Sequence, residues 1–441
     1  MQIRIFCGRF KIWNLINWFL VNFCFERLAK TILITITMKK VSKKIVSVLL
    51  VFSFILVAFN SINLSSAQSA NKAVRKIIVF NDNFSDKEAK KGLLKKFGAE
   101  DLGDLNLING RVVLLPEKAV ASLKKLSDVK RVEDDVMFYA LGKPSSPPGK
   151  DKDKEPQPAQ EASWGHERIG ASEANITNKG AGIRVGIIDS GISLKHPDLN
   201  VVGGINTINT RKSYDEDLGH GSHVAGTVAA LDNEIGVIGV APEAELYAIK
   251  VLNRRGVGYL SDIIEGLQWS IDNNMQVVNM SLGRLTPSVS YEEAINKVYN
   301  AGITIVAAAG NDGDLRDSNH EIYYPARYAN TIAVSATDIE DNLAWFSSWS
   351  TGIDLTAPGQ DINSTYKGDG YHIGNGTSMA TPHVVGVVAL ILNTQVGIYD
   401  LDGDEEWDPV EVKNKLQAGA ENLGLTTEKQ GAGLVSALSG V

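Results

Sequence analysis

Four polar residues stand beside glycines between long apolar runs: Asp189, His220, Asn311 and Ser378. Ser378 follows a glycine-led turn and opens an apolar, helix-patterned run. A serine hydroxyl is a poor nucleophile until a base accepts its proton, and the charge that develops on a substrate carbonyl needs a hydrogen-bond donor. The chain therefore holds candidates for a nucleophile, a base, a carboxylate that orients the base, and a donor. This set suits acyl transfer.

Alternating apolar segments predict the scaffold that positions these residues. The expected strands are 183–188, 246–251, 277–280 and 304–309, and the expected helices begin at His220 and Ser378 and span 260–273 and 292–301. Strands that are apolar almost throughout, separated by amphipathic helices, are typical of an α/β fold whose mostly parallel sheet has helices on both faces. Sites in such sheets form at the carboxyl ends of strands, where Asp189 and Asn311 both lie.

The order Asp, His, Ser and the residues around each motif resemble the subtilisin-like serine proteases from about residue 160 to the C-terminus. The resemblance implies that Asp189 orients His220 and that His220 accepts the proton of Ser378. It also implies that Asn311 and the backbone N–H of Ser378 stabilise the oxyanion. We therefore expect a serine endopeptidase that works through an acyl-enzyme.

The resemblance further implies that two edge segments bind an extended peptide as an added strand. The expected substrate-binding residues are Gly256, Val257, Gly258, Ser281, Leu282, Gly283, Ala308, Ala309, Gly310 and Tyr323. Two positions depart from the common pattern of the family. Arg284 follows Ser-Leu-Gly where glycine is frequent, and Tyr323 stands where the floor of the first pocket is often glycine. A bulky floor predicts a shallower first pocket, so the preference for large apolar residues stays open.

Residues 231–237 resemble the high-affinity calcium loop of the family. The implied oxygen ligands are the carbonyls of Leu231, Ile235 and Val237 and the side chains of Gln160, Asp198 and Asn233. An all-oxygen shell suits structural Ca²⁺. Because Gln160 lies at the expected new N-terminus, we expect the full site to form only after processing.

An acidic insertion over residues 399–408 carries Asp400, Asp402, Asp404 and Asp408. A second calcium site and a solvated acidic loop both remain open there. His223 lies one turn after His220, and His383 lies within the helix after the nucleophile; we expect both to be packed or hydrogen-bonded. A metal site at His220 and His223 lacks the H-E-x-x-H pattern and a third ligand.

The N-terminal 67 residues predict a targeting segment. From Met38, a basic start, an apolar run and small residues before the end at Ala67 are typical of a secretory signal peptide over residues 38–67, with an uncleaved anchor as the alternative. Residues 1–37 are expected to be a start-site misassignment. The two cysteines, Cys7 and Cys24, both precede Met38, so the remainder can use neither a disulfide nor a thiol nucleophile.

Residues 68–141 predict a small α+β, ferredoxin-like domain. A capping box at Ser85–Glu88 opens one helix that ends near residue 97, a second helix spans 116–127, and a last strand spans 132–141. The tail of this domain resembles the end of the propeptide that acts as chaperone and inhibitor in subtilisin-like enzymes.

Residues 142–160 are rich in Pro, Lys, Asp and Gly and predict an exposed linker and processing region, with a mature N-terminus near Ala159. The peptidase domain is expected over 161–441. We expect a secreted, extracellular monomer that acts on proteins or peptides, with its propeptide as inhibitor and without membrane association after signal cleavage. Lys plus Arg number 44 and Asp plus Glu number 51, so nothing indicates a nucleic-acid binder.

Three alternatives differ at identifiable residues. An α/β-hydrolase requires Ser before Asp before His and a Gly-x-Ser-x-Gly turn, and neither is present. A related acid peptidase would use Glu rather than His220 as its base. A catalytically silent secreted binding protein on the same fold should carry a substitution in the triad or at Asn311, and these four positions are intact.

Overall fold

The computed structural model describes residues 73–144, 157–313 and 321–441. The chain divides into one unit that ends at Lys72 and a second unit over Ala73–Val441. The start-site hypothesis for 1–37 and the signal peptide at 38–67 therefore lie outside the described residues, as does most of the linker. Within the described ranges, no helix has the length and apolar character needed to span a bilayer.

Seven parallel strands form the centre of the peptidase domain, in the order β15-β14-β13-β11-β7-β9-β8. Their bounds are β7 Arg184–Asp189, β8 Val201–Asn206, β9 Glu245–Lys250, β11 Val277–Met280, β13 Thr304–Ala308, β14 Ile332–Thr337 and β15 Leu355–Pro358. Most of them are buried along their whole length. Burial on both faces explains the uninterrupted apolar runs in the sequence.

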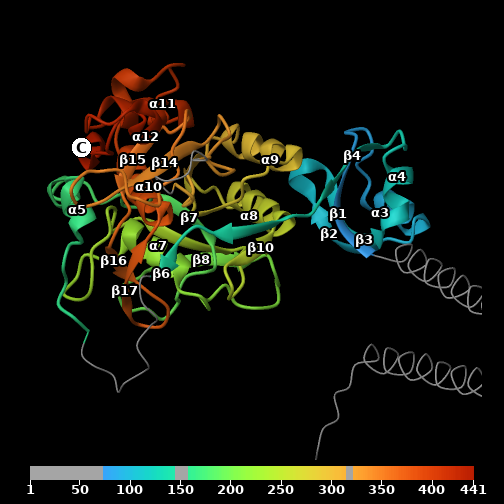
Figure 1. Cartoon of the computed structure of the whole chain (residues 1–441), viewed down its shortest axis with the longest axis horizontal. Coiled ribbons are helices and arrows are strands. Elements are labelled where there is room, and N and C mark those ends of the chain that lie inside the picture. Colours follow the sequence, from blue (N-terminus) through green and yellow to red (C-terminus); the bar gives the residue numbers. More distant parts are fainter. Residues whose placement is uncertain (1–72, 145–156, 314–320) are drawn as a thin grey trace, which may run out of the picture. The chain divides into compact units, whose positions relative to one another are not determined.

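Helices cover both faces of this sheet (Figure 1). On one face, α7 (His220–Ala229) and α10 (Thr377–Leu392) share a core with Ile187. On the other, α8 (Leu260–Asp272) and α9 (Val289–Tyr299) share a core with Ile188. Successive strand residues point to opposite faces, which is why these two neighbours belong to different cores. The predicted fold class is confirmed.

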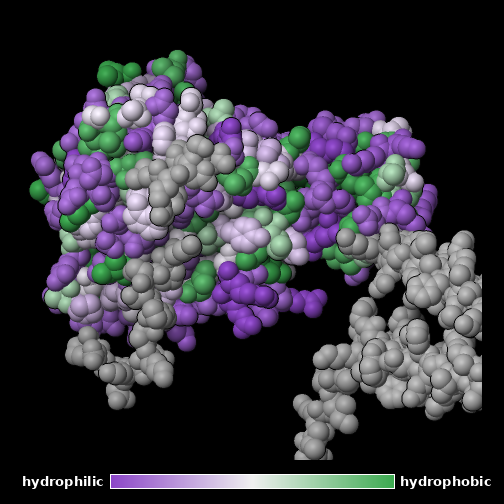
Figure 2. All heavy atoms as spheres, in the orientation of Figure 1, coloured by the Kyte–Doolittle hydropathy of each residue, from purple (hydrophilic) through white to green (hydrophobic). Residues whose placement is uncertain are grey.

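Shorter elements complete the peptidase domain. They are α5 Trp164–Arg168, α6 Ala171–Ala174, β10 Val257–Tyr259, β12 Leu282–Gly283, β16 Ile362–Thr365, β17 Tyr371–Asn375, η2 Gly397–Tyr399, α11 Pro409–Ala418, α12 Thr427–Gln430 and η3 Ala437–Gly440. On the face shown in Figure 2, hydrophilic side chains predominate and apolar ones are scattered among them. The apolar residues are thus gathered mainly inside.

The N-terminal domain is a four-stranded antiparallel sheet in the order β2-β3-β1-β4 with two helices. Its elements are β1 Ala73–Phe80, α3 Lys87–Lys96, β2 Glu100–Leu105, η1 Asn106–Ile108, β3 Gly110–Pro116, α4 Glu117–Leu123 and β4 Val129–Asp134. The two helices pack on it through a separate core that includes Phe80, Leu94 and Leu123. The predicted α+β domain is confirmed, although the first helix is capped by Asp86, which accepts a hydrogen bond from Ala89 N at 2.6 Å, rather than by Ser85.

The prediction of a single strand over residues 132–141 is wrong. The segment forms two strands in different sheets, β4 and β5 (Met137–Ala140), separated at Asp135. The Asp135 carboxylate accepts hydrogen bonds from the backbone N and the Oγ of Ser261, at 2.9 and 2.8 Å, at the start of α8. The chain therefore leaves the N-terminal sheet at Asp135. The backbone is extended on both sides of this residue, so the residue pattern alone does not show that two strands are present.

A second carboxylate of β4 joins the N-terminal domain to the peptidase domain. Glu133 accepts hydrogen bonds from Ser288 Oγ at 2.7 Å and from Ser290 N at 3.0 Å, at the start of α9. Glu133 and Asp135 thus satisfy N–H groups at the first turns of two helices, where negative charge is also favoured by the helix dipole.

Candidate active site

The four predicted residues meet at the carboxyl edge of the parallel sheet. Asp189 is the last residue of β7, His220 is the first residue of α7, and Ser378 is the second residue of α10. Asn311 lies three residues after the end of β13. The contacts among their neighbours, given below, bring these four positions into one site.

His220 is held by Asp189. Its Nδ1 lies 2.8 Å from both carboxylate oxygens, and both side chains are buried. Burial lowers the pKa of His220, but the charge and hydrogen bonds of Asp189, together with the charge of Glu216, outweigh burial and raise this pKa above its ordinary value. A proton fixed on Nδ1 leaves Nε2 as the acceptor. Among the described residues, Nε2 has no hydrogen-bond partner.

The Ser378 hydroxyl donates to the carbonyl oxygen of Ser281 at 3.1 Å rather than to His220. Gly142 lies beside His220 instead, since a Cβ built on Gly142 would stand 2.8 Å from Nε2. Gly376, before the nucleophile, has a φ of 152°, and a Cβ there would lie 2.6 Å from the carbonyl oxygen of Leu141. Glycine at 376 therefore permits the close approach of residues 141 and 142 to the site.

Asn311 presents its amide N–H₂ to the site. Its Oδ1 accepts hydrogen bonds from Thr377 N at 2.9 Å and Thr377 Oγ1 at 3.0 Å. The Nδ2 atom consequently faces away from these donors, and it donates to the carbonyl oxygen of Leu141. A preorganised donor on a carbonyl oxygen is what oxyanion stabilisation requires.

An extended segment of the chain itself crosses the site. β5 pairs antiparallel with β10 on one side and β12 on the other, and Leu141 N donates to Ser281 O at 3.1 Å. Beyond Gly142, β6 (Lys143–Pro144) pairs antiparallel with β17. Main-chain pairing thus holds residues 137–144 on both sides of the Leu141–Gly142 peptide bond.

Comparisons with known proteins fit this geometry. Residues 180–434 match the peptidase S8 subtilase family. The chain belongs to the subtilase family. It is 46% identical over 280 residues to subtilisin Savinase of Lederbergia lenta, and the matched region covers 63% of this chain and 98% of that protein.

Two relatives also match much of the region before the peptidase domain. An alkaline protease of Alkalihalobacillus alcalophilus is 39% identical over 408 residues, covering 90% of this chain and 98% of that protein. Subtilisin E of Bacillus subtilis is 38% identical over 389 residues, covering 87% and 95%. This subtilase is a serine endopeptidase.

The Leu141 side chain, before the Leu141–Gly142 peptide bond, is 7% exposed. A Cβ on Gly283 would contact both Leu141 Cδ1 and Tyr323 Cβ at 3.0 Å, so Leu141 and Tyr323 lie on the same side of Gly283. The Tyr323 hydroxyl donates to Asp312, and the ring lies against Gly310. The tyrosine is thereby fixed beside Leu141, and the shallow first pocket stays a prediction.

A further pocket holds Phe138, three residues before Leu141. Phe138 is fully buried, and its ring meets that of Tyr291 edge to face at 5.0 Å. The Arg284 guanidinium lies 5.8 Å from the same ring. Arg284 therefore contacts the fourth residue of the bound segment, and Tyr291, which no motif contains, was missed from the sequence.

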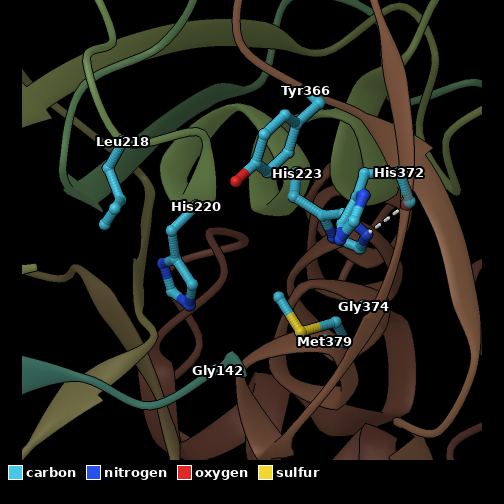
Figure 3. A pocket seen from close by; sticks show the side chains of 8 residues that line it. All are labelled: Gly142, Leu218, His220, His223, Tyr366, His372, Gly374 and Met379. Atoms are coloured by element: carbon cyan, nitrogen blue, oxygen red, sulfur yellow. Dashed lines mark hydrogen bonds between the residues drawn. The ribbon is translucent and has the colours of Figure 1, made fainter. Parts of the chain in front are cut away.

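A cavity of about 60 Å³ opens on the other side of the peptide bond, beside Gly142 (Figure 3). Its lining residues are Gly142, Leu218, His220, His223, Tyr366, His372, Gly374 and Met379. Figure 3 shows Tyr366 and Met379 extending toward the space between His220 and His372. Tyr366 and His372 come from the β16–β17 region, which no chemical motif marks, so sequence reasoning missed them.

The two additional histidines make the packed contacts expected of them. His223 Nε2 lies 3.0 Å from Ile362 O and 2.9 Å from His372 O, and burial lowers its pKa to about 3. His383 Nδ1 lies 2.8 Å from Met379 O, and burial lowers its pKa to about 4. Both imidazoles are therefore neutral at physiological pH.

The residues of the expected calcium loop lie together. Gln160 Oε1 accepts from Asn233 N at 2.6 Å, and Asp198 accepts from Asn233 Nδ2 at 2.8 Å and Val237 N at 3.0 Å. Ala159 also pairs with Ile235. Gln160 therefore reaches the loop in the uncut chain, so the expectation that processing is needed to bring it there is wrong. The Asp198 side chain is fully buried, and burial raises its pKa to about 6. A buried carboxylate whose contacts here are uncharged fits a divalent cation.

The acidic insertion brings together a different set from the one expected. Oxygen atoms of Asp400, Asp402 and Glu411 lie within 4.8 Å of one another. Asp408 instead caps α11 with Glu411 in a capping box. Glu411 was missed because it lies beyond the acidic run, on the helix that follows.

Proposed function

We propose that this subtilase is a secreted endopeptidase in which Ser378 attacks the peptide carbonyl, His220 is the base, Asp189 orients it and Asn311 stabilises the oxyanion. The proposal rests on one observation: the Leu141–Gly142 peptide bond of the chain lies between the proposed hydrogen-bond donor, Asn311, and the proposed base, His220. Asn311 Nδ2 donates to the carbonyl oxygen of Leu141, and Gly142 lies against His220 Nε2.

The reaction begins with a rotation of the Ser378 hydroxyl from Ser281 O to His220 Nε2. The hydroxyl oxygen then attacks the substrate carbonyl while Nε2 accepts its proton, and Asp189 stabilises the imidazolium. Asn311 Nδ2 and the Ser378 N–H hold the oxyanion. The imidazolium protonates the leaving amine, and water hydrolyses the acyl-enzyme by the same route.

We infer that residues 68–141 are an inhibitory propeptide and that the chain cuts itself first between Leu141 and Gly142. This bond is the one seated at Asn311 and His220. Residues near Ala159 are instead held on the calcium loop, where Gly236 N donates to Pro158 O at 2.8 Å. A mature N-terminus near Ala159 therefore requires a second cut in the linker.

After the first cut, the new C-terminus at Leu141 stays bound because β5 remains paired with β10 and β12. Glu133 and Asp135 keep their hydrogen bonds to the first turns of α9 and α8. The propeptide therefore occupies the substrate groove as an inhibitor. Substrates bind the same edges through their main chains, which supports action on many proteins or peptides.

A calcium ion is proposed at Gln160, Asp198 and Asn233 and the carbonyls of Leu231, Ile235 and Val237. When bound, it supplies structural charge compensation for Asp198 and fixes the segment after the linker. Secretion is supported by the signal-peptide pattern before Gln68 and by the match to alkaline protease and subtilisins.

Labelling with a fluorophosphonate probe tests the nucleophile independently of substrate choice. Processed protein should react at Ser378 in proportion to its casein-hydrolysing activity, and Ser378→Ala should lose both. Ser436→Ala, far along the chain from the motif, is the control and should keep both. Labelling at another serine, or casein hydrolysis by Ser378→Ala, would refute the assignment.

A further inference from the structure

A second carboxylate, Glu216, lies behind the Asp189–His220 pair. The Ser190 hydroxyl is 3.0 Å from Asp189 Oδ1 and 3.0 Å from Glu216 Oε2. A hydroxyl carries one proton and can donate it to only one acceptor at a time. The two carboxylates thus compete for the same donor, which couples Glu216 to the orienting carboxylate.

Glu216 also anchors the start of the helix that carries His220. Its Oε2 accepts from Ser222 N at 3.1 Å, and its Oε1 accepts from Leu218 N at 2.8 Å and Asp217 N at 2.9 Å. The N-cap residue of α7 is Gly219, which has no side chain to cap the helix. Glu216 supplies the missing acceptor from the preceding loop.

The contacts of Glu216 favour its ionised form. Its carboxylate oxygens accept hydrogen bonds from backbone N–H groups and from the Ser190 hydroxyl, whereas burial opposes ionisation and raises the pKa of this carboxyl. Its position at the N-terminus of α7 also favours negative charge. The side chain is partly buried, so its charge is weakly screened toward His220.

Other ionisable groups of the described chain also face His220. Tyr366 and His372 line the same cavity, and burial favours their neutral forms, raising the pKa of Tyr366 and lowering that of His372. Asp189 bonds to Nδ1 of His220, and His223 is neutral because burial lowers its pKa to about 3. Lys250 Nζ donates to Ser190 O and lies 2.8 Å from Asp217 Oδ1, so its charge is paired with a carboxylate whose side chain is 49% exposed. Asp189 and Glu216 are the two carboxylates whose charges raise the pKa of His220.

We propose that Glu216 is a positioning residue of the peptidase reaction. It fixes His220 through the start of α7 and Asp189 through Ser190, and its charge stabilises the imidazolium that forms during acyl transfer. The proposal rests on the proposed roles of Asp189, His220 and Ser378.

The pH profile of kcat/KM tests the charge directly. His220 must be neutral to accept the serine proton, so activity falls as pH drops through its pKa. Glu216→Gln removes the charge and should move this acidic limb to lower pH by roughly 0.5 to 1 unit, while the limiting kcat/KM falls about 10-fold. Asp215→Asn, the matched control on an exposed carboxylate of the same loop, should move the limb by less than about 0.2 unit.

Glu216→Asp separates charge from shape and serves also if the glutamine variant does not fold. It should keep the acidic limb of the wild type, within about 0.2 unit, and lower only the limiting rate. The proposal would be overturned if the acidic limb of the pH profile did not move in folded Glu216→Gln, or if it moved in Glu216→Asp. Failure of the proposed function would look different, because the wild-type protein itself would not react with a fluorophosphonate.

Discussion

Asn311 is held so that its amide N–H₂ faces the scissile carbonyl, because Thr377 occupies its oxygen. Asn311→Ala should therefore lower kcat by about 100- to 1,000-fold with little change in KM, since the donor acts on charge that develops in the transition state. Steady-state hydrolysis of a Leu-ending peptide substrate measures this. A rise in KM at unchanged kcat would place Asn311 in ground-state binding and contradict the role.

Tyr323 should set the size preference of the first pocket. Its hydroxyl is tied to Asp312 and its ring covers Gly310, so the pocket accepts Leu141. Tyr323→Gly should shift the ratio of kcat/KM for Phe over Leu at the first position upward by roughly 10-fold or more. Arg284→Ala is the matched control, because Arg284 lies on Phe138 and should change only the fourth position. An unchanged ratio in Tyr323→Gly would refute the assignment.

Asp189, His220, Asn311 and Ser378 could be named from the sequence because glycine-containing turns mark them, and their catalytic roles stay predictions. Some residues that lie beside them in the structure could not be named. Tyr291 lies on an ordinary amphipathic helix, and Tyr366 and His372 lie on a hairpin whose packing is decided by distant contacts. Such positions carry no local chemical signal, so only the tertiary structure assigns them.

At the level of elements, the calcium loop should control stability. Saturating calcium at about 1,000 times its Kd stabilises a native state by roughly 4 kcal/mol. For a domain of this size, that should raise Tm by roughly 5 to 8 °C over the EDTA-treated protein. Differential scanning calorimetry of inactive Ser378→Ala measures it without self-digestion.

Two variants locate the calcium response. Asp198→Asn should abolish most of the shift in Tm, because it removes the buried carboxylate of the loop. Asp402→Asn, in the exposed acidic insertion, should retain it. If Asp402→Asn lost the shift in Tm and Asp198→Asn kept it, the stabilising ion would be assigned to Asp400, Asp402 and Glu411 rather than to residues 231–237.

Long buried strands and amphipathic helices were predictable because their periodicity is strong, and each of those named for the peptidase domain is present. β8 was not predicted, since Gly203 and Gly204 interrupt its apolar pattern. β4 and β5 were merged because an extended backbone has the same residue pattern in either sheet. Their separation depends on Asp135 and Ser261, which lie 126 positions apart in the sequence.

At the scale of the whole molecule, the contact between propeptide and peptidase domain should depend on pH. Burial raises the pKa of Glu265 to about 7, and the charge of Asp262 on the same helix adds to this. Of the propeptide residues, Arg75 opposes the rise, while Asp104 and Asp135 contribute to it. Propeptide departure removes these carboxylates and exposes Glu265. The complex therefore binds protons more tightly than the free enzyme, and it should weaken as pH rises through about 7.

The rate at which activity appears from purified, self-cleaved complex measures this dependence. Release should be faster at pH 9 than at pH 6, and Glu265→Gln should remove most of the difference. Asp272→Asn, at the exposed end of the same helix, should leave it unchanged. Faster release at pH 6 would contradict the sign of the effect.

The most direct test of the account is the first cut made by purified precursor, wild type beside Ser378→Ala, followed by intact mass and N-terminal sequencing. The wild type should release a fragment that ends at Leu141 and a chain that begins at Gly142, before any end near Ala159 appears, and Ser378→Ala should stay whole. A first new N-terminus anywhere else, or cleavage of Ser378→Ala, would contradict the seating of the Leu141–Gly142 bond at a serine peptidase site.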